Sequence, residues 1–209
     1  VIQGYILTLL DGGLEDPDIN RKYLEKTEKS INRMITIVKD LETISRLEHG
    51  VLTLQQTNFD IFQVSTDIVE SLEDRARKKG IKIVFKEGSN KKTMVHADPD
   101  RIRQVITNLI VNAINYGKEK GYVRIAFYDM EENIMIEIKD DGIGISEEHL
   151  PRLFERFYRV DKSRSMQSGG TGLGLAIVKH IIEAHKQTIN IRSSSGVGTT
   201  IAFTLKKKN

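Results

Sequence analysis

The sequence predicts an α+β protein in which an N-terminal helical hairpin precedes a mixed, largely antiparallel sheet with helices on one face. Apolar residues recur at helical spacing through the first part of the 209-residue chain. Strand-like and helix-like segments then alternate to the C-terminus, and most strands read as hairpin-connected neighbours. The composition, with 39% hydrophobic and 29% charged residues, suffices for a core. We therefore expect a hairpin over 1–50 and a sheet domain over 51–209.

Two helices make up the predicted hairpin. The first covers residues 2–10 and ends at Asp11-Gly12-Gly13, while Asp16-Pro17 opens a second helix that runs from about 21 to 47. The second helix carries two apolar series with a seven-residue step: Leu24, Ile31 and Val38, and Thr27, Met34 and Leu41. Because one hairpin cannot bury both series, we expect a homodimer that forms a four-helix bundle. The alternative is a hairpin that packs on its own sheet domain.

The remaining segments give the elements of the sheet domain. Helices are predicted over 61–79, 98–116 and about 173–184, because each shows apolar residues at helical spacing and two of them end at a glycine. Strands are predicted over 81–85, 93–97, 122–128, 134–139, 188–192 and 199–205.

Composition excludes several classes of function. Cysteine is absent, which rules out a disulfide framework, a thiol nucleophile and a Cys-ligated metal. The net charge of +3 is a thin surplus, so we expect no nucleic-acid partner. No apolar run approaches the roughly 20 residues of a membrane span. Since the chain begins with Val1, we expect a piece of a longer protein, attached to a membrane only through segments upstream.

A row of side-chain amides is the first candidate for chemistry. Gln104, Asn108 and Asn112 lie four residues apart and share one face of the helix predicted over 98–116. The other positions of this helix are almost wholly apolar, so the helix is expected to be embedded. An amide oxygen is a suitable ligand for Mg²⁺ that already carries phosphate oxygens and water. The alternative is that these amides only bridge backbone groups inside the core.

Two glycine-rich segments are the second candidate. In Asp140-Asp141-Gly142-Ile143-Gly144 a carboxylate ends a strand, where it can accept from the amine of adenine, and the glycines admit a flat ligand. The glycines of residues 169–175 precede a helix, where free N–H groups and the helix dipole favour phosphate. Between them, the stretch 154–165 suggests a lid whose Arg159 and Arg164 contact terminal phosphate. A capping turn, a hinge and an ordinary surface loop are the respective alternatives.

In their order along the chain, these segments resemble the catalytic core of two-component sensor histidine kinases. Residues 108–113 resemble the N box, 140–144 the first glycine box, 154–157 the F box, 170–175 the second glycine box and 196–199 the last glycine turn. The resemblance covers the chain: the hairpin is similar to the dimerisation and histidine phosphotransfer module, and about 56–209 to a GHKL-type ATP-binding domain. It implies an α/β sandwich, a mixed sheet faced by helices with ATP between them.

The resemblance implies Mg²⁺ and ATP as ligands and gives residues their roles. Asn112 would ligate Mg²⁺ with help from Asn108, Asp140 would bind the adenine amine, Tyr116 would border the nucleotide, and Arg159 would lie near the γ-phosphate. The other implied nucleotide contacts are Asn115, Gly142, Gly144, Ile145, Tyr158, Arg164, Gly170, Thr171, Gly172, Leu173, Gly174, Leu175 and Thr199.

The sequence departs from the family at Asn115, where many relatives carry lysine. A phosphate contact from this position is therefore in doubt. We expect Lys118, Lys162 or Arg164 to supply the missing cation instead.

The family's phosphoacceptor histidine is expected upstream of Val1. The five histidines present, His49, His96, His149, His180 and His185, are interpreted as structural. We therefore expect no catalytic residue within the chain, and a fragment that binds ATP without phosphorylating itself. In the complete protein, the γ-phosphoryl would pass to that histidine and then to an aspartate of a response-regulator receiver domain. The resemblance implies the cytoplasmic part of an inner- or plasma-membrane protein.

Two other functions remain open. An ATPase of the wider superfamily needs a water-activating carboxylate four residues before the metal-binding asparagine. The residue there is Asn108, which is neutral and cannot act as a general base, so hydrolysis is disfavoured. A nucleotide-binding or purely dimeric interaction module without catalysis would need little more than the hairpin.

Overall fold

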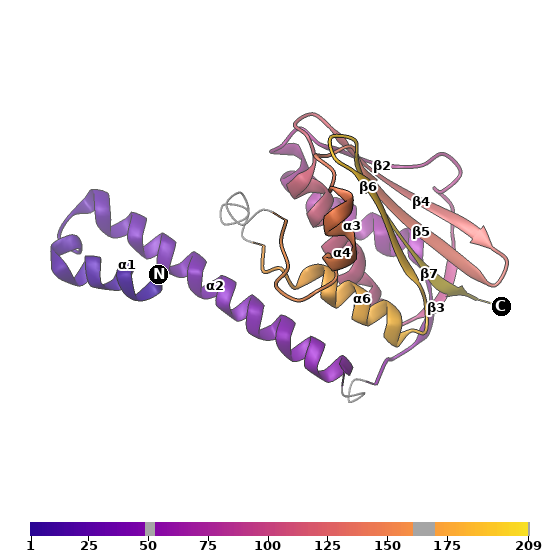
Figure 1. Ribbon diagram of the computed structural model, residues 1–209, viewed down its shortest axis with the longest axis horizontal. Helices are drawn as coiled ribbons and strands as arrows, with labels where there is room; N and C mark the ends of the chain where they lie inside the picture. The colour runs from indigo at the N-terminus through magenta and orange to yellow at the C-terminus, as the bar shows by residue number, and fades with distance from the viewer. Residues whose placement is uncertain (49–52, 161–169, 209) are drawn as a thin grey trace.

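A long helical hairpin leads into a sheet domain in the computed structural model, which describes residues 1–48, 53–160 and 170–208 (Figure 1). Helix α1 (Ile2–Thr8) continues into a π-type segment, η1 (Leu9–Gly13), and α2 (Pro17–Glu48) returns alongside it. The chain reverses where Gly12 adopts φ +88°, and Asp16 starts α2 by accepting a hydrogen bond at 2.9 Å from the Asp18 amide. The predicted hairpin is confirmed. The His49-Gly50 stop lies outside the described residues.

The sheet has seven strands, of which six follow the order β1-β3-β7-β5-β4-β2 and β6 pairs with β7. The strands are β1 (Thr57–Asp60), β2 (Lys82–Phe85), β3 (Met94–Ala97), β4 (Tyr122–Met130), β5 (Asn133–Asp140), β6 (Ile189–Ser194) and β7 (Gly198–Lys207). Among the strands of the described residues, β2 and β4 form the one parallel pair, and the other pairs are antiparallel. The predicted mixed, largely antiparallel sheet is confirmed. Strand β1 and a 3-10 segment, η2 (Glu147–Arg152), were not predicted from the sequence.

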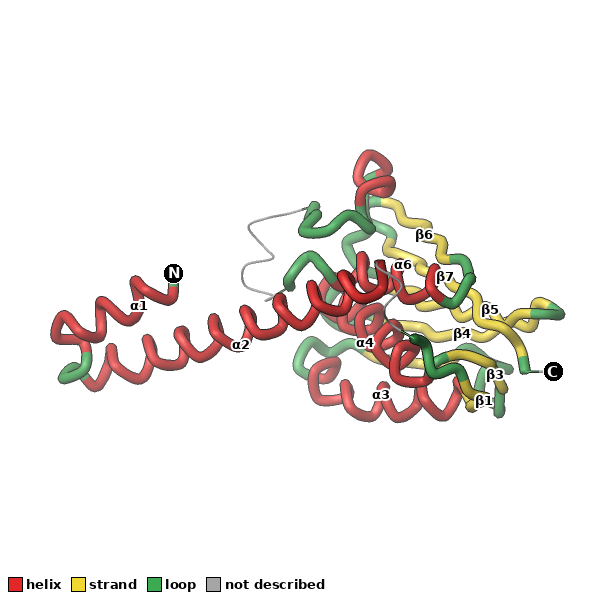
Figure 2. Tube along the Cα trace, turned by 90° about the horizontal axis from the view of Figure 1, so that it is seen from below, coloured by secondary structure: helices red, strands yellow, loops and turns green. Residues whose placement is uncertain are grey.

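Three helices cover one face of this sheet: α3 (Ile61–Arg77), α4 (Pro99–Tyr116) and α6 (Gly174–Ala184) (Figures 1 and 2). Helix α4 contacts both α3 and α6. Asp98 caps α4 by accepting from the amides of Asp100 and Arg101, both at 3.1 Å. The apolar face of α4 is buried: Ile102, Val105, Ile106, Leu109, Ile110, Ala113 and Ile114. Because that face is fixed against the sheet, the amide row on the other side of α4 is fixed as well.

Helix α2 packs on the sheet domain near its C-terminal end. It lies along α6 (Figure 2), and Ile44 is only 1% exposed within the same apolar cluster as the sheet core. The apolar residues of the seven-residue series stay exposed in the single chain: Leu24, Ile31, Met34, Val38 and Leu41. Packing on its own domain thus accounts for one part of α2 and leaves the apolar series uncovered. Among the helices that the structure describes, none is both long and apolar enough to cross a bilayer.

His185 joins the end of α6 to the start of α4. Its Nδ1 lies 2.8 Å from the Ile181 carbonyl oxygen, and its Nε2 lies 3.0 Å from the Asp98 amide nitrogen. The amide can only donate, so Nε2 accepts and the ring is neutral. Burial lowers the pKa of this imidazole below its ordinary value. Protonation would place two donors face to face in the core.

We therefore expect the folded protein to lose stability as the pH falls through the ordinary histidine pKa of about 6.5. Below that pH the unfolded chain binds the proton and the folded chain does not, so the contribution of His185 is complete above about pH 7 and falls by at most about 1.4 kcal/mol by pH 5.5. Urea unfolding at pH 7.5 and 5.5 measures this loss of unfolding free energy. In His185→Gln the drop should be smaller, since the amide keeps both hydrogen bonds without titrating. An equal drop in both proteins would contradict the assignment.

Candidate nucleotide-binding site

The amide row of α4 faces the beginning of α6. The carboxamide carbon and oxygen of Asn108 each lie 3.7 Å from the position that a Cβ on Gly174 would occupy. Asn108 and Asn112 are half-buried, and no hydrogen bond within the described residues holds either amide. Gln104 differs, because its Oε1 accepts from Arg101 Nη1 at 3.2 Å. Two of the three amides are thus open to a ligand, and amide oxygens fit a Mg²⁺ ion that also carries phosphate oxygens.

Asp140 is a buried carboxylate at the end of β5. Its Oδ1 accepts from the Gly142 amide at 2.8 Å and from the Thr199 amide at 3.3 Å. Burial raises the pKa of the carboxyl, the two amide bonds oppose part of this rise, and Asp141 adds to it. Both bonds reach the same oxygen, which leaves Oδ2 for a ligand donor. The sequence expectation of a buried carboxylate at a strand end is confirmed, while its role stays a prediction.

The first glycine segment fits tightly between the end of α4 and strand β6. A Cβ on Gly142 would lie 2.4 Å from the Tyr116 carbonyl oxygen, and one on Gly144 would lie 1.9 Å from that of Ser194. Gly144 also has φ +65°. The Ile143 amide donates to the Tyr116 carbonyl at 3.1 Å. These close approaches bring Tyr116, which is 42% exposed, next to the turn that carries Asp140.

The second glycine segment leads into the N-terminus of α6. No side chain of the described residues caps this terminus, so the amides of its first turn keep their hydrogens for another acceptor. Arg159 Nη1 donates to the Gly170 carbonyl at 2.6 Å, while its Nη2 is buried without a partner in the described part of the chain. A buried guanidinium donor without a partner is costly, and an anion would satisfy it. The structure thus brings Arg159 to the loop where phosphate is expected.

Helix α2 also contacts this loop. Arg33 Nη2 donates to the Gly170 carbonyl at 3.2 Å, and the Thr171 hydroxyl donates to Asp40 Oδ2 at 3.3 Å. Burial raises the pKa of the Asp40 carboxyl, and the hydrogen bond from Thr171 counteracts it. The Thr171 oxygen in turn accepts from the Leu173 amide at 3.2 Å. Sequence reasoning missed Arg33 and Asp40, because no local pattern links them to a loop more than 130 residues away.

Some of the expected contact residues are held by other groups. Tyr158 bonds to His149 Nδ1 at 2.7 Å, and its ring lies against Arg152. The side chain of Leu173 is fully buried, and Leu175 packs against the core. The Ile145 amide donates to Ser193 at 2.9 Å.

Of the three cations expected to replace a lysine at position 115, the structure describes Lys118 alone. Lys118 Nζ donates to the Gly196 carbonyl at 2.8 Å. Lys162 and Arg164 lie outside the described residues. Asn115 Oδ1 instead accepts from Arg75 Nη2, on α3, at 3.0 Å.

The fold and this site define a class of ATPase-like domains. Residues 97–209 match the family model described as Histidine kinase-, DNA gyrase B-, and HSP90-like ATPase. The chain belongs to this family.

Within the family, the chain is similar to sensor histidine kinases. It is 35% identical to the sensor histidine kinase WalK of Bacillus subtilis over 209 residues, which cover 99% of this chain and 34% of that protein. The chain therefore spans about one third of that relative. Among solved structures, the histidine kinase AdeS of Acinetobacter baumannii superposes with a TM-score of 0.82 at 28% identity, over 100% of this chain and 94% of that one.

A second solved structure is the histidine kinase ThkA in complex with the response regulator protein TrrA. It superposes with a TM-score of 0.78 at 27% identity, over 99% of this chain and 57% of that one. The expected resemblance and fold class are confirmed: the chain has the fold of a histidine kinase catalytic core.

Proposed function

We propose that the chain is the catalytic core of a sensor histidine kinase and that it binds ATP with Mg²⁺. The observation that carries the proposal is the convergence of three groups: the open amides of α4, the buried Asp140 and the uncapped N-terminus of α6. An ATPase-like family match over the same residues supports it.

Each part of the nucleotide meets a group of matching chemistry. Asp140 Oδ2 accepts from the adenine amine, since Oδ1 is already engaged by the amides of Gly142 and Thr199. The amides that open α6 and the free Nη2 of Arg159 bind phosphate oxygens. Asn112 and Asn108 hold Mg²⁺, which supplies charge neutralisation on the phosphates when bound. The protein contributes position and charge, since Asn108 cannot activate water.

The phosphoryl acceptor in this proposal is a histidine outside the 209 residues. His185 is buried with both ring nitrogens engaged, His96 lies 2.9 Å from Asn58, and His149 bonds to Tyr158. None of these three stands on the hairpin. His49 lies outside the described residues, and His180 is on α6. We propose that the chain alone does not autophosphorylate.

The exposed apolar residues of α2 support a homodimer in which a second copy of the hairpin completes a four-helix bundle. The response-regulator complex of ThkA supports a receiver domain as the next phosphoryl acceptor. We place the chain on the cytoplasmic side of a membrane protein, by similarity to sensor kinases.

Replacing Asn112 by Ala should remove the Mg²⁺-dependent part of ATP binding. Calorimetric titration of the 209-residue chain with ATP, with and without Mg²⁺, should show a gain from Mg²⁺ in the unaltered protein and a loss of about tenfold or more in Asn112→Ala. Asn190→Ala, on the exposed side of β6, is the control and should bind normally. In the complete protein, label from γ-labelled ATP should then reach histidine only when Asn112 is intact.

Two results would contradict the proposal. If the ATP affinity of the unaltered chain and of Asn112→Ala depended equally on Mg²⁺, Asn112 would not be a metal ligand. Rapid multiple turnover of ATP by the chain would favour an ATPase instead.

A further inference from the structure

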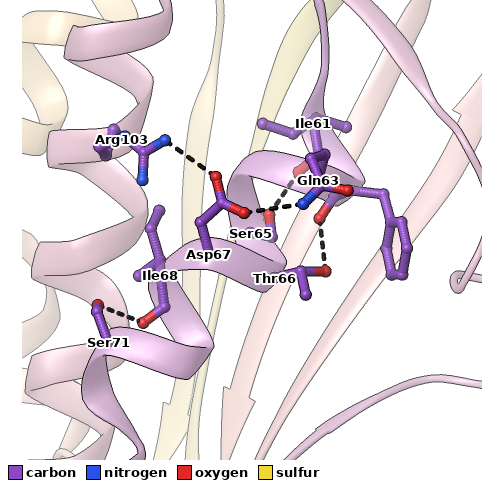
Figure 3. Close-up of polar contacts among 9 residues, drawn as sticks. Ile61, Gln63, Ser65, Thr66, Asp67, Ile68, Ser71 and Arg103 are labelled. Carbon is purple, nitrogen blue, oxygen red and sulfur yellow. Dashed lines mark hydrogen bonds and ion pairs between the residues drawn. The ribbon is translucent and has the colours of Figure 1, made fainter.

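Helix α3 packs against α4, beside the amide row. Asp67 accepts from Arg103 Nη2 of α4 at 3.3 Å and from Gln63 Nε2 at 2.8 Å (Figure 3). Ile68 and Ala76 of α3 are buried in the core. The orientation of α3 against α4 is thus fixed by packing on one side and by an ion pair on the other, and this determines where its last turn lies.

That last turn carries Arg75 to the end of the amide row. Arg75 Nη2 donates to Asn115 Oδ1 at 3.0 Å. Asn115 follows Asn108 by seven residues and Asn112 by three, so the three amides share one face of α4. The guanidinium therefore extends the same row of polar groups and ends it with a positive charge.

The charge of Arg75 has no direct carboxylate partner in the described part of the chain. No carboxylate of the described residues forms an ion pair with it. Its neighbour Lys79 is a second cation: burial and the charge of Arg75 lower the pKa of Lys79, and the carboxylate of Glu119 opposes part of this. Lys79 has a structural role, because its Nζ donates to the carbonyls of Ile114 at 3.1 Å and Asn115 at 2.6 Å. Arg75 is exposed and donates to Asn115 through one nitrogen, so the other donors of its guanidinium are open to a ligand.

We propose that Arg75 binds the phosphate chain of the nucleotide and that Asn115 positions its guanidinium for this contact. The inference rests on the proposed function. From the sequence, the cation that replaces a lysine at position 115 was expected on α4 or in the loops that follow it. The structure instead supplies a cation from α3. An arginine fork held by an amide suits phosphate oxygens, since it offers parallel donors together with a full charge.

Titration of the 209-residue chain with Mg²⁺-ATP and with adenosine tests this contact. Arg75→Ala should weaken ATP binding about tenfold and leave adenosine binding unchanged, because adenosine has no phosphate. The salt dependence of ATP binding should fall as well. Arg77→Ala is the matched control: it removes an exposed arginine of the same turn that pairs with Asp74, and it should change neither ligand. Adding Asn115→Lys to Arg75→Ala should restore ATP binding by placing a cation on α4.

Failure of the proposed function and failure of the Arg75 contact give different results. If the unaltered chain binds no ATP, the proposed function fails. If it binds ATP and Arg75→Ala binds equally well, or loses ATP and adenosine to the same degree, the role of Arg75 is overturned while the proposed function stands. Failure of Asn115→Lys to restore binding would overturn the placement of the cation at Asn115.

Discussion

Replacing Asp140 by Asn should cost at least about 100-fold in ATP affinity while the protein stays folded. The Asn oxygen can still accept from the amides of Gly142 and Thr199, so the turn after β5 keeps its hydrogen bonds. The position of Oδ2 becomes an NH₂ group. This group and the adenine amine are both donors, so no hydrogen bond forms between them. A buried polar group left without a partner is the strongest source of discrimination that a binding site has.

Calorimetry with ATP and a thermal unfolding curve together measure this result. Asp141→Asn is the matched control, because it changes the neighbouring carboxylate, whose Oδ1 accepts from the Tyr122 amide at 3.0 Å and keeps that acceptor as an amide. It should bind ATP normally. Normal ATP affinity in Asp140→Asn would show that the base is recognised elsewhere.

Replacing Gly144 by Ala should destabilise the fold by about 3 kcal/mol or more. The backbone there has φ +65°, and the added Cβ would lie 1.9 Å from the Ser194 carbonyl oxygen. Backbone cannot rotate away as a side chain can, so β6 and the glycine turn must separate. ATP binding should be lost too, because the same turn carries Asp140.

Denaturant unfolding of Gly144→Ala beside Gly88→Ala isolates the cause. Gly88 also has a positive φ, of +81°, but nothing lies within 4 Å of the position of its Cβ. Gly88→Ala therefore reports the conformational cost alone, about 1 kcal/mol. If both variants lose the same stability, the close contact with Ser194 is not what requires glycine at this position.

Much of the fold could be predicted because its elements have local causes. Asp98-Pro99 begins α4 where a capping aspartate predicts it, and Gly80, with φ +66°, follows the end of α3. Strand β1 was missed, since its four residues include a single apolar side chain, Phe59, and show no alternation. It is held as a strand by pairing with β3, a tertiary effect that no window of sequence contains.

The candidate site likewise contains residues that local spacing predicts and residues that depend on tertiary packing. The amide row, Asp140 and the glycines were predictable because spacing along one element places them. The contacts of Arg33 and Asp40 with residues 170 and 171 depend on how α2 packs on α6, and the pair Arg75–Asn115 depends on how α3 packs on α4. Periodicity says which face a residue occupies and nothing about which helix will face it.

The burial of Ile44 in the core couples the rotation of α2 to the sheet domain. Asp40 and Ile44 are four residues apart and lie on the same side of α2, so a rotation of α2 that moves Ile44 out of the core would also move Asp40 away from Thr171. A rotation of the hairpin would therefore act on the second glycine loop directly, because α2 itself contacts this loop. By thermodynamic reciprocity, a ligand that reshapes this loop must push back on α2 with the same free energy.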